Sequence, residues 1–189
     1  MNFKYPIILA SKSPRRQWLL KEAGFDFTIE TKDTNEDFPA DMNVYEVPAY
    51  LARKKALAMT EFLKGDTVLI TADTVVIQKN QILGKPADAA EAKQMILQLS
   101  GARHEVVTGV CLKSQQKEVV FSDLTEVHFT TLSEEEIDWY IQKHQPFDKA
   151  GAYGAQEWIG MVAIEKLVGS YFNVMGLPVH KLYQELRDF

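Results

Sequence analysis

Residues 7–20, with the sequence IILASKSPRRQWLL, are the stretch around which the rest of this chain is organised. The apolar run 7–10 predicts a short buried strand. Ser13 followed by Pro14 predicts a helix start, because serine caps helices and proline fits the first helical position, where its missing N–H costs nothing. An apolar face follows at residues 18–20. We therefore expect a strand, a tight turn and the N-terminus of a helix.

Arg15 and Arg16 would fall in the first turn of this helix. The helix macrodipole places partial positive charge there, so two cations are locally unfavourable. An anion held between them and the free backbone N–H groups would offset this cost, and phosphate is the usual one. The alternative is that both arginines are solvated surface residues.

Composition limits the classes of protein to consider. The chain has 189 residues, 46% of them apolar and 25% charged, which is ordinary for a globular domain. Its net charge is -5, which argues against a nucleic-acid-binding surface but leaves room for a small basic pocket. Cys111 is the only cysteine, so no intrachain disulfide can form. Four consecutive apolar residues after Pro6 are too few for a signal peptide, and no apolar run approaches the ~18 residues of a membrane span, so we expect a cytoplasmic protein.

The remaining patterns alternate between helix and strand. Apolar spacing predicts helices at 48–63, from Asp88 to a stop at Gly101, at 133–145 with a capping box, and after Pro178. Strands are expected at 25–30, 67–78, 81–83, 103–113, 117–132 and 161–167, and loops at 32–43 and 146–156. Strand 67–78 is almost continuously apolar, which is typical of a central strand covered on both faces. The alternation predicts an α/β or α+β fold with a mixed sheet.

Asp73 interrupts the apolar central strand. A carboxylate in a covered strand is costly unless it is paired, hydrogen-bonded or bound to a cation. It is either a structural aspartate that accepts backbone or threonine hydrogen bonds, or a functional carboxylate, a class over-represented in such positions.

Basic residues elsewhere could complete a polyphosphate pocket. Lys55 falls at the edge of the buried face of helix 48–63, Lys85 stands between a glycine and a proline, and Lys149 lies in a tight loop. Each alone reads more simply as a solvated surface lysine, but together with a helix N-terminus they suit polyphosphate. Glu36 in the acidic loop 32–43 could share a divalent ion with Asp73, since two carboxylates and phosphate oxygens are the usual ligands of magnesium.

Several chemistries lack their motifs in this sequence. There is no G-x-x-x-x-G-K-[ST] and no G-x-G-x-x-G, and the four histidines show no metal-ligand spacing. Ser11, Ser13 and Cys111 have no recognisable base partner, so covalent catalysis is not expected. Of the chemistries considered, the one that these residues still suit is metal-assisted attack of water on a phosphoanhydride.

Seven motifs in register resemble the Maf proteins, a family of cytoplasmic nucleoside triphosphate pyrophosphatases formerly described as septum-formation inhibitors. They are LASKSPRRQWLL, ARKKA, TADTVV, GKP, SG-x-x-H-x-V-x-TGV, DKAGAYGAQ and NVMGLPV, and the match runs from Ile8 to Pro178, nearly the whole chain. The resemblance implies a single domain over residues 1–189, with an elongated mixed sheet, flanking helices and a deep cleft between two lobes, similar to inosine triphosphate pyrophosphatases. It also implies a housecleaning enzyme that uses a divalent metal, Mg or Mn, and that is often a homodimer.

The resemblance also assigns roles to residues of this chain. It implies that Asp73 is the catalytic base and, with Glu36, holds the metal. It implies that base choice depends on Arg15, Thr74 and Gln156. The phosphate-binding positions fall on Ser11, Arg15, Arg16, Lys55, Lys85 and Lys149.

S-P-R-R together with A-Y-G-x-Q resembles the branch of the family that acts on dTTP and UTP, and modified pyrimidine triphosphates fit the same branch. Two alternatives stay open: a nucleotide-binding regulator of cell division without turnover, and a pyrophosphatase for 7-methyl-GTP or other purine triphosphates. One departure is visible, because Gln145 stands where the family usually has glutamate before proline. A missing carboxylate there would weaken a second metal contact or a loop hydrogen bond.

Overall fold

The computed structural model describes residues 4–189. In it, residues 7–22 form the strand and the helix that the sequence predicts. β1 (Ile7–Leu9) leads to α1 (Pro14–Glu22). Ser13 occupies the N-cap position, but its side chain makes no capping hydrogen bond, so the predicted capping role is wrong. The Ser11 hydroxyl instead accepts a hydrogen bond from the Ser13 amide at 3.2 Å.

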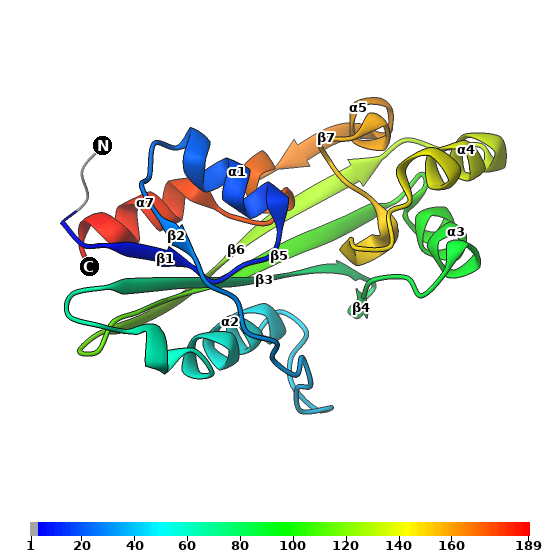
Figure 1. Cartoon of the computed structure of the whole chain (residues 1–189). Coiled ribbons are helices and arrows are strands. Elements are labelled where there is room, and N and C mark those ends of the chain that lie inside the picture. Colours follow the sequence, from blue (N-terminus) through cyan, green and yellow to red (C-terminus); the bar gives the residue numbers. More distant parts are fainter. Residues whose placement is uncertain (1–3) are drawn as a thin grey trace. The chain divides into compact units, whose positions relative to one another are not determined.

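The described residues contain a seven-stranded sheet in the order β2-β1-β3-β5-β6-β7, with β4 paired to β3 (Figure 1). β1 pairs in parallel with β2 and β3, whereas the β3–β4 and β6–β7 pairs are antiparallel. The mixed sheet and the α/β class are thus confirmed. The strands after β1 are β2 (Thr28–Ile29), β3 (Val68–Gln78), β4 (Gln81–Leu83), β5 (Arg103–Lys113), β6 (Glu118–Phe129) and β7 (Ile164–Val168).

The chain divides into two compact units, and β3, β5 and β6 contribute residues to both. The first unit contains α1, α2 (Val47–Leu57), the 3₁₀ turn η1 (Thr60–Phe62) and α7 (Val179–Arg187). The second contains α3 (Ala89–Leu99), α4 (Glu134–His144), the 3₁₀ turn η2 (Ala150–Ala152), α5 (Trp158–Ala163) and α6 (Tyr171–Val174). The first unit is made of residues up to Thr74, Thr108–Asp123 and Gly176–Phe189, and the second of Val75–Val107 and Leu124–Met175.

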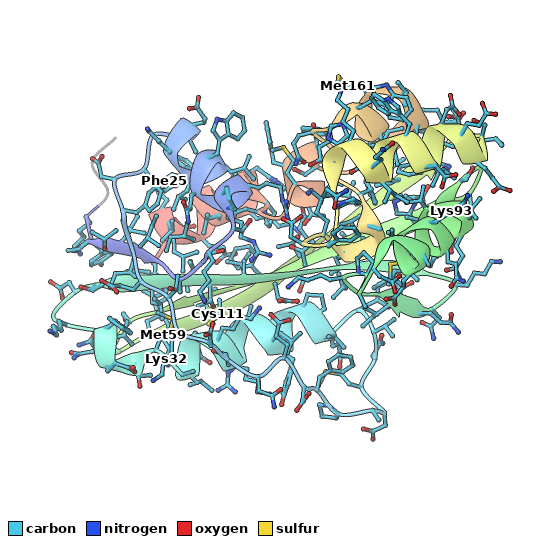
Figure 2. All side chains as sticks on the ribbon, turned by 45° about the vertical axis from the view of Figure 1, so that its right-hand side comes forward. Phe25, Lys32, Met59, Lys93, Cys111 and Met161 are labelled. Carbon is cyan, nitrogen blue, oxygen red and sulfur yellow. The ribbon has the colours of Figure 1, made fainter. Side chains whose placement is uncertain are left out.

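In the first unit, α1 and α7 lie on one face of β1 and β3, and α2 lies on the other (Figure 1). Met59 and Cys111 mark the core between α2 and the sheet (Figure 2), where Ala52, Ala56 and Leu69 are also buried. A Cβ atom on Gly109 of β5 would lie 2.2 Å from the amide nitrogen of Ala49. Glycine at this position is therefore what lets the start of α2 rest directly on the strand.

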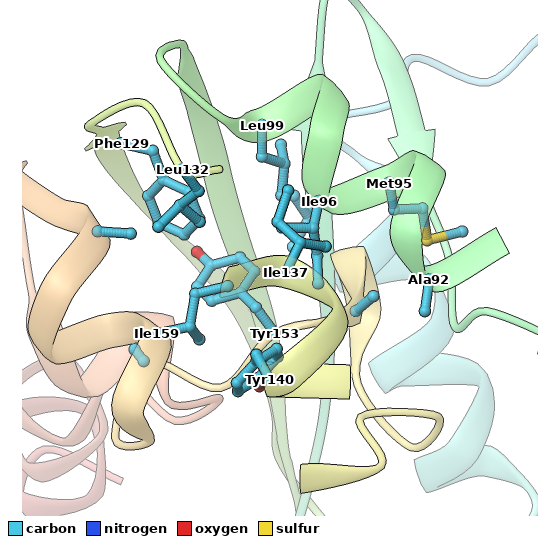
Figure 3. Close-up of a cluster of buried hydrophobic side chains, with 14 of the residues drawn as sticks. Ala92, Met95, Ile96, Leu99, Phe129, Leu132, Ile137, Tyr140, Tyr153 and Ile159 are labelled. Carbon is cyan, nitrogen blue, oxygen red and sulfur yellow. The ribbon is translucent and has the colours of Figure 1, made fainter. Parts of the chain in front are cut away.

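In the second unit, a core of apolar side chains joins α3, α4, α5 and η2 to the sheet (Figure 3). Asp88 is the N-cap of α3, and its side chain accepts a hydrogen bond from the Glu91 amide. α4 carries the predicted capping box between Ser133 and Glu136. Both predicted helix starts are confirmed, because capping depends on residues within one turn of each other.

Three predicted elements differ from the structure. The strand expected at 25–30 is reduced to β2, whose residues are exposed, because Phe25 turns away to pack on Tyr183 with the ring centroids 6.3 Å apart. The helix expected at 48–63 ends at Leu57, and the 3₁₀ turn η1 brings the remaining apolar residues to the core. The strand expected at 161–167 begins only at Ile164.

The segment before Ile164 is helical because α5 buries Ile159 and Ala163, one turn apart, against the core. Met161, 75% exposed, and Val162 point away from it, so their apolar character was a misleading signal for a strand. Among residues 4–189, no helix combines the length and the apolar character that crossing a membrane requires.

Candidate functional site

Asp73 lies in β3 and its carboxylate pairs with the ammonium of Lys55. The Lys55 Nζ atom is 2.6 Å from Asp73 Oδ1 and 2.7 Å from Glu36 Oε1. The Asp73 side chain is 13% exposed and that of Lys55 20%, so this pair is shielded from water, whereas Glu36 is half exposed. The predicted carboxylate pair, Asp73 and Glu36, therefore converges on one cationic side chain.

The placement of Lys55 follows from how α2 is fixed on the sheet. The Thr71 hydroxyl of β3 donates a 2.6 Å hydrogen bond to the Ala52 carbonyl of α2. This bond and the close contact at Gly109 hold the helix against β3 and β5. Lys55 stands one turn beyond Ala52 on the same face of the helix, which directs it toward Asp73.

The acidic loop 32–43 is attached to the same helix. Lys54 Nζ donates to the Asp37 carbonyl at 2.8 Å, next to the Lys55–Glu36 pair. Within the loop, the Asp37 amide donates to Asn35 Oδ1 at 2.6 Å. Two consecutive lysines of α2 thus fix the part of the loop that carries Glu36.

The Arg16 guanidinium donates hydrogen bonds to three protein acceptors. Its Nε atom donates to the Gly176 carbonyl at 2.7 Å, and Nη1 donates to the Ala72 carbonyl at 2.9 Å. Nη2 donates to the Thr74 hydroxyl at 2.9 Å. Desolvation lowers the pKa of Arg16, and the negative charge of Asp73 opposes this effect. The side chain therefore joins α1 to the two residues that flank Asp73 in β3, and it is not the solvated surface residue of the alternative.

Thr74 also forms a hydrogen bond with Thr108, a residue to which sequence analysis assigned no role. The Thr74 and Thr108 hydroxyl oxygens are 2.9 Å apart, and Thr108 is fully buried. Its position in the TGV motif was the available signal. Of the other residues predicted in this unit, Ser11 is buried and Arg15 is half-buried in the first turn of α1.

In the second unit, Lys149 is buried beside two carboxylates. Its Nζ atom is 2.7 Å from Asp148 Oδ1 and 3.1 Å from Glu157 Oε1. The Tyr140 hydroxyl donates to the other oxygen of Glu157 and accepts a hydrogen bond from the Gly154 amide at 3.1 Å. Glu157 and Tyr140 were missed by sequence reasoning, although Glu157 directly follows the DKAGAYGAQ motif.

Lys85 follows β4 and lies at the surface. The Gly84 carbonyl accepts a 3.0 Å hydrogen bond from the Gly151 amide, so the GKP turn is joined to the loop that carries Lys149. Lys85 also borders a cavity of about 270 Å³. The walls of this cavity are β4 and the Glu91, Gln94 and Gln98 side of α3.

Gln156 presents a buried acceptor. Among the described residues, its Oε1 atom has no hydrogen-bond partner. Tyr153, in the same loop, is a core residue: its side chain is 5% exposed, and its hydroxyl oxygen lies 2.8 Å from His104 Nε2. Gln145, at the family's glutamate position, closes α4 by donating to the Ile141 and Gln142 carbonyls.

The structure thus distributes the predicted residues over the two units. Within residues 4–189, no group of three or more His, Cys, Asp or Glu side chains could hold a metal by itself. The first unit contains Ser11, Arg15, Arg16, Glu36, Lys55, Asp73 and Thr74, and the second contains Lys85, Lys149 and Gln156.

Comparison with known proteins places these observations in a family. The chain is 52% identical over 191 residues to a dTTP/UTP pyrophosphatase of Porphyromonas gingivalis, covering 98% of this chain and 95% of that protein. It is 51% identical to one of Cytophaga hutchinsonii, covering 95% and 82% of the two chains. A third, from Bacteroides thetaiotaomicron, is 47% identical over 97% of this chain and 96% of its own.

Solved structures give a weaker likeness. The Ham1 protein of Staphylococcus aureus superposes with a TM-score of 0.48 at 14% identity, over 66% of this chain and 71% of its own. A nucleoside-triphosphatase (dITP/XTP pyrophosphatase) of Mycobacterium abscessus gives a TM-score of 0.45 at 14% identity, over 96% and 93% of the two chains. The family model described as "Maf-like protein" matches residues 6–189. The chain belongs to the Maf family.

Proposed function

We propose that this protein is a dTTP/UTP pyrophosphatase, which hydrolyses either nucleotide to the monophosphate and pyrophosphate. The activity is that of relatives 47–52% identical over nearly the whole chain. The observation that carries the mechanism is the Asp73 carboxylate, held in a covered strand with Lys55 at 2.6 Å. A shielded carboxylate with one fixed partner is an arrangement that suits a general base.

Asp73 accepts the proton of the attacking water in this mechanism. The water oxygen forms a bond to the α-phosphorus, and the bond from that phosphorus to the oxygen bridging toward the β-phosphorus breaks. Pyrophosphate leaves, and the proton taken by Asp73 returns to solvent. Lys55 orients the carboxylate, and Arg16 fixes the strand on both sides of it through the Ala72 carbonyl and the Thr74 hydroxyl.

Asp73 and Glu36 suit a divalent cation. Their oxygens lie 2.6 and 2.7 Å from one ammonium nitrogen, which places two carboxylates around a single positive charge. Such a pair, completed by phosphate oxygens, is typical of Mg²⁺ or Mn²⁺ sites. When bound, the metal would neutralise phosphate charge and make the phosphorus a better electrophile.

We assign Lys85, Lys149 and Ser11 to the phosphates, together with Lys55 and Arg15. Gln156 is assigned to the base. Uracil and thymine present an acceptor, a donor and an acceptor on one edge, and a glutamine amide offers a complementary acceptor and donor. The buried Oε1 of Gln156 supports this assignment, because an acceptor without a partner is costly until a ligand satisfies it. Thr74 and Arg15 complete the specificity set.

Pyrophosphate release from a panel of nucleotides tests this proposal. With Mg²⁺, we expect dTTP and UTP to be hydrolysed in preference to CTP, GTP and 7-methyl-GTP. Preferred hydrolysis of GTP or 7-methyl-GTP would overturn the substrate but not the reaction. Binding of dTTP without pyrophosphate release would overturn the enzyme and favour the nucleotide-binding regulator.

Two further implications of the family resemblance stay predictions. A homodimer is expected and can be checked by light scattering of the purified protein. A cytoplasmic location is expected and can be checked by cell fractionation.

A further inference from the structure

We propose that Glu157 is a positioning residue that fixes the phosphate-binding Lys149 and the base-selecting Gln156 relative to each other. This inference rests on the proposed function, because it needs the assigned roles of those two residues. Glu157 itself is not expected to contact the nucleotide. The argument concerns the second unit alone, where all of these residues lie.

The first contact of Glu157 is with Lys149. Its Oε1 atom is 3.1 Å from Lys149 Nζ, and the two side chains are 17% and 9% exposed. Asp148, the other partner of this ammonium, is 60% exposed and therefore better screened by water. Glu157 is the partner in the drier environment, so it contributes more to the direction in which the ammonium points.

The second contact is with Tyr140. The Tyr140 hydroxyl donates to the other carboxylate oxygen and accepts from the Gly154 amide at 3.1 Å. The tyrosine is fully buried, and burial together with the Glu157 hydrogen bond raises its pKa. The phenol therefore keeps its proton at neutral pH and remains a donor to Glu157. The chain of bonds Lys149–Glu157–Tyr140–Gly154 is continuous.

The third contact is with the turn that carries Gln156. A Cβ atom on Gly154 would lie 2.8 Å from Glu157 Cδ and 3.0 Å from Gln156 Nε2. The Glu157 carboxylate therefore packs on the backbone of Gly154, which has no side chain, and lies next to the side-chain amide of Gln156. The Glu157 amide also donates to the Gly154 carbonyl at 3.0 Å, which closes the turn over residues 154–157.

One carboxylate thus joins both halves of nucleotide recognition in this unit. Its oxygens hold the lysine assigned to phosphate and, through Tyr140, the amide of the glycine at which the specificity turn begins. Loss of its charge should loosen Lys149 and the 154–156 turn together. The expected signature is a combined loss of rate and of base discrimination, which a residue that only stabilised the fold would not produce.

The test uses Glu157→Gln and Tyr140→Phe in the full chain, with Glu165→Gln on the exposed surface of β7 as the matched control. The kinetic constants kcat and KM are measured for UTP and CTP, together with unfolding by urea. We expect Glu157→Gln to lower kcat/KM for UTP by about tenfold or more and to reduce the UTP-to-CTP preference. Tyr140→Phe should act in the same direction but less strongly, and Glu165→Gln should have no effect.

A double-mutant cycle separates positioning from simple destabilisation. In a Lys149→Ala background, Glu157→Gln should lower the rate of UTP hydrolysis by a much smaller factor than it does in the wild type, because the partner of the carboxylate is gone. Equal losses in both backgrounds, or an unchanged UTP-to-CTP ratio in both Glu157→Gln and Tyr140→Phe, would overturn the proposal. If Glu157→Gln does not fold, Tyr140→Phe decides by the same criteria.

The failure of the proposed function has a different signature. If Lys149→Ala and Gln156→Ala both keep the wild-type rate and base preference, their assigned roles fall, and the inference about Glu157 falls with them. If these two variants are impaired while Glu157→Gln and Tyr140→Phe behave as wild type, only the positioning role is overturned.

Discussion

Lys55 and Asp73 form a shielded ion pair across α2 and β3, with 2.6 Å between the ammonium nitrogen and the nearer carboxylate oxygen. The pair explains how an aspartate is accommodated within an otherwise apolar strand, since a carboxylate removed from water needs a charged or hydrogen-bonding partner. Glu36 shares the same ammonium from an exposed loop. This arrangement is the basis of the first prediction.

Asp73→Asn should lower kcat for dTTP by ~10²-fold or more, the scale expected for the loss of a general base or metal ligand. The amide keeps the shape of the carboxylate but cannot accept the proton. Pyrophosphate release gives the rate, and circular dichroism checks that the fold is retained. Asp66→Asn, in the exposed turn before β3, is the matched control. Wild-type rates in Asp73→Asn would make Asp73 a structural residue.

Arg16→Ala should impair hydrolysis of every triphosphate alike. The Ala72 and Gly176 carbonyls and the Thr74 hydroxyl would lose their donor, which releases the strand around Asp73. We also expect the free energy of unfolding to fall by about 1–3 kcal/mol. Urea denaturation and steady-state kinetics measure both effects, and exposed Arg187→Ala is the control. A change of base preference at unchanged stability would contradict this explanation.

Lys85→Ala should slow the hydrolysis of dTTP and UTP by similar factors, because a phosphate contact is independent of the base. Its side chain is at the surface, so urea denaturation should show little change in stability. Lys64→Ala, at another exposed lysine, provides the comparison. Altered preference among bases with no general loss of rate would remove Lys85 from the phosphate site.

Gln156→Ala should reduce discrimination between UTP and CTP by ~1–3 kcal/mol, the usual penalty when polar groups of a bound partner are left unpaired. Competition between dTTP, UTP, CTP and GTP for hydrolysis is the direct measurement. Gln142→Ala on the exposed face of α4 controls for the substitution itself. Undiminished preference would show that Gln156 only supports the loop.

His104 should make the protein less stable in mild acid. Burial lowers its pKa from 6.5 to about 3, so the native state stays unprotonated while the unfolded chain takes up a proton below pH 6.5. Its contribution to stability is therefore complete above pH 6.5 and decreases as the pH falls toward 3. We expect a loss of about 2 kcal/mol between pH 7 and pH 5.

Urea denaturation of the wild type and of His104→Phe at pH 7 and pH 5 measures this effect. The phenylalanine variant cannot bond to Tyr153 and is expected to be less stable at pH 7, but it should lose less stability on acidification. An equal loss in both proteins would assign the acid sensitivity to other groups.

Local features of this fold could be predicted from the sequence because their partners are sequence neighbours. The capping box of Ser133 and Glu136 and the cap formed by Asp88 on the Glu91 amide both involve contacts within one helical turn. The order of such signals predicted a mixed sheet. The reaction class was implied by the resemblance of seven sequence motifs to the Maf family.

Other features depended on residues that are distant in the sequence. Apolar alternation at Phe25–Ile29 and the apolar residues of segment 161–167 indicated strands, but the packing of the Phe25 side chain and of α5 gave a different structure in part of each segment. The sequence indicated that Arg16 lies near a site, but it did not identify the hydrogen-bond partners of Arg16. One of them, Gly176, is 160 positions away in the sequence.

The candidate site shows the same division. The sequence by itself determined which residue types were present for phosphate, metal and base: carboxylates, lysines and an amide. Only the tertiary structure decided that Lys55 would stand between Glu36 and Asp73, and that Glu157 would join Lys149 to Tyr140. The physical reason is that charge pairing and burial depend on distance through space, which the packing of α2 on β3 and the turn at Gly154 set, and which sequence spacing does not encode.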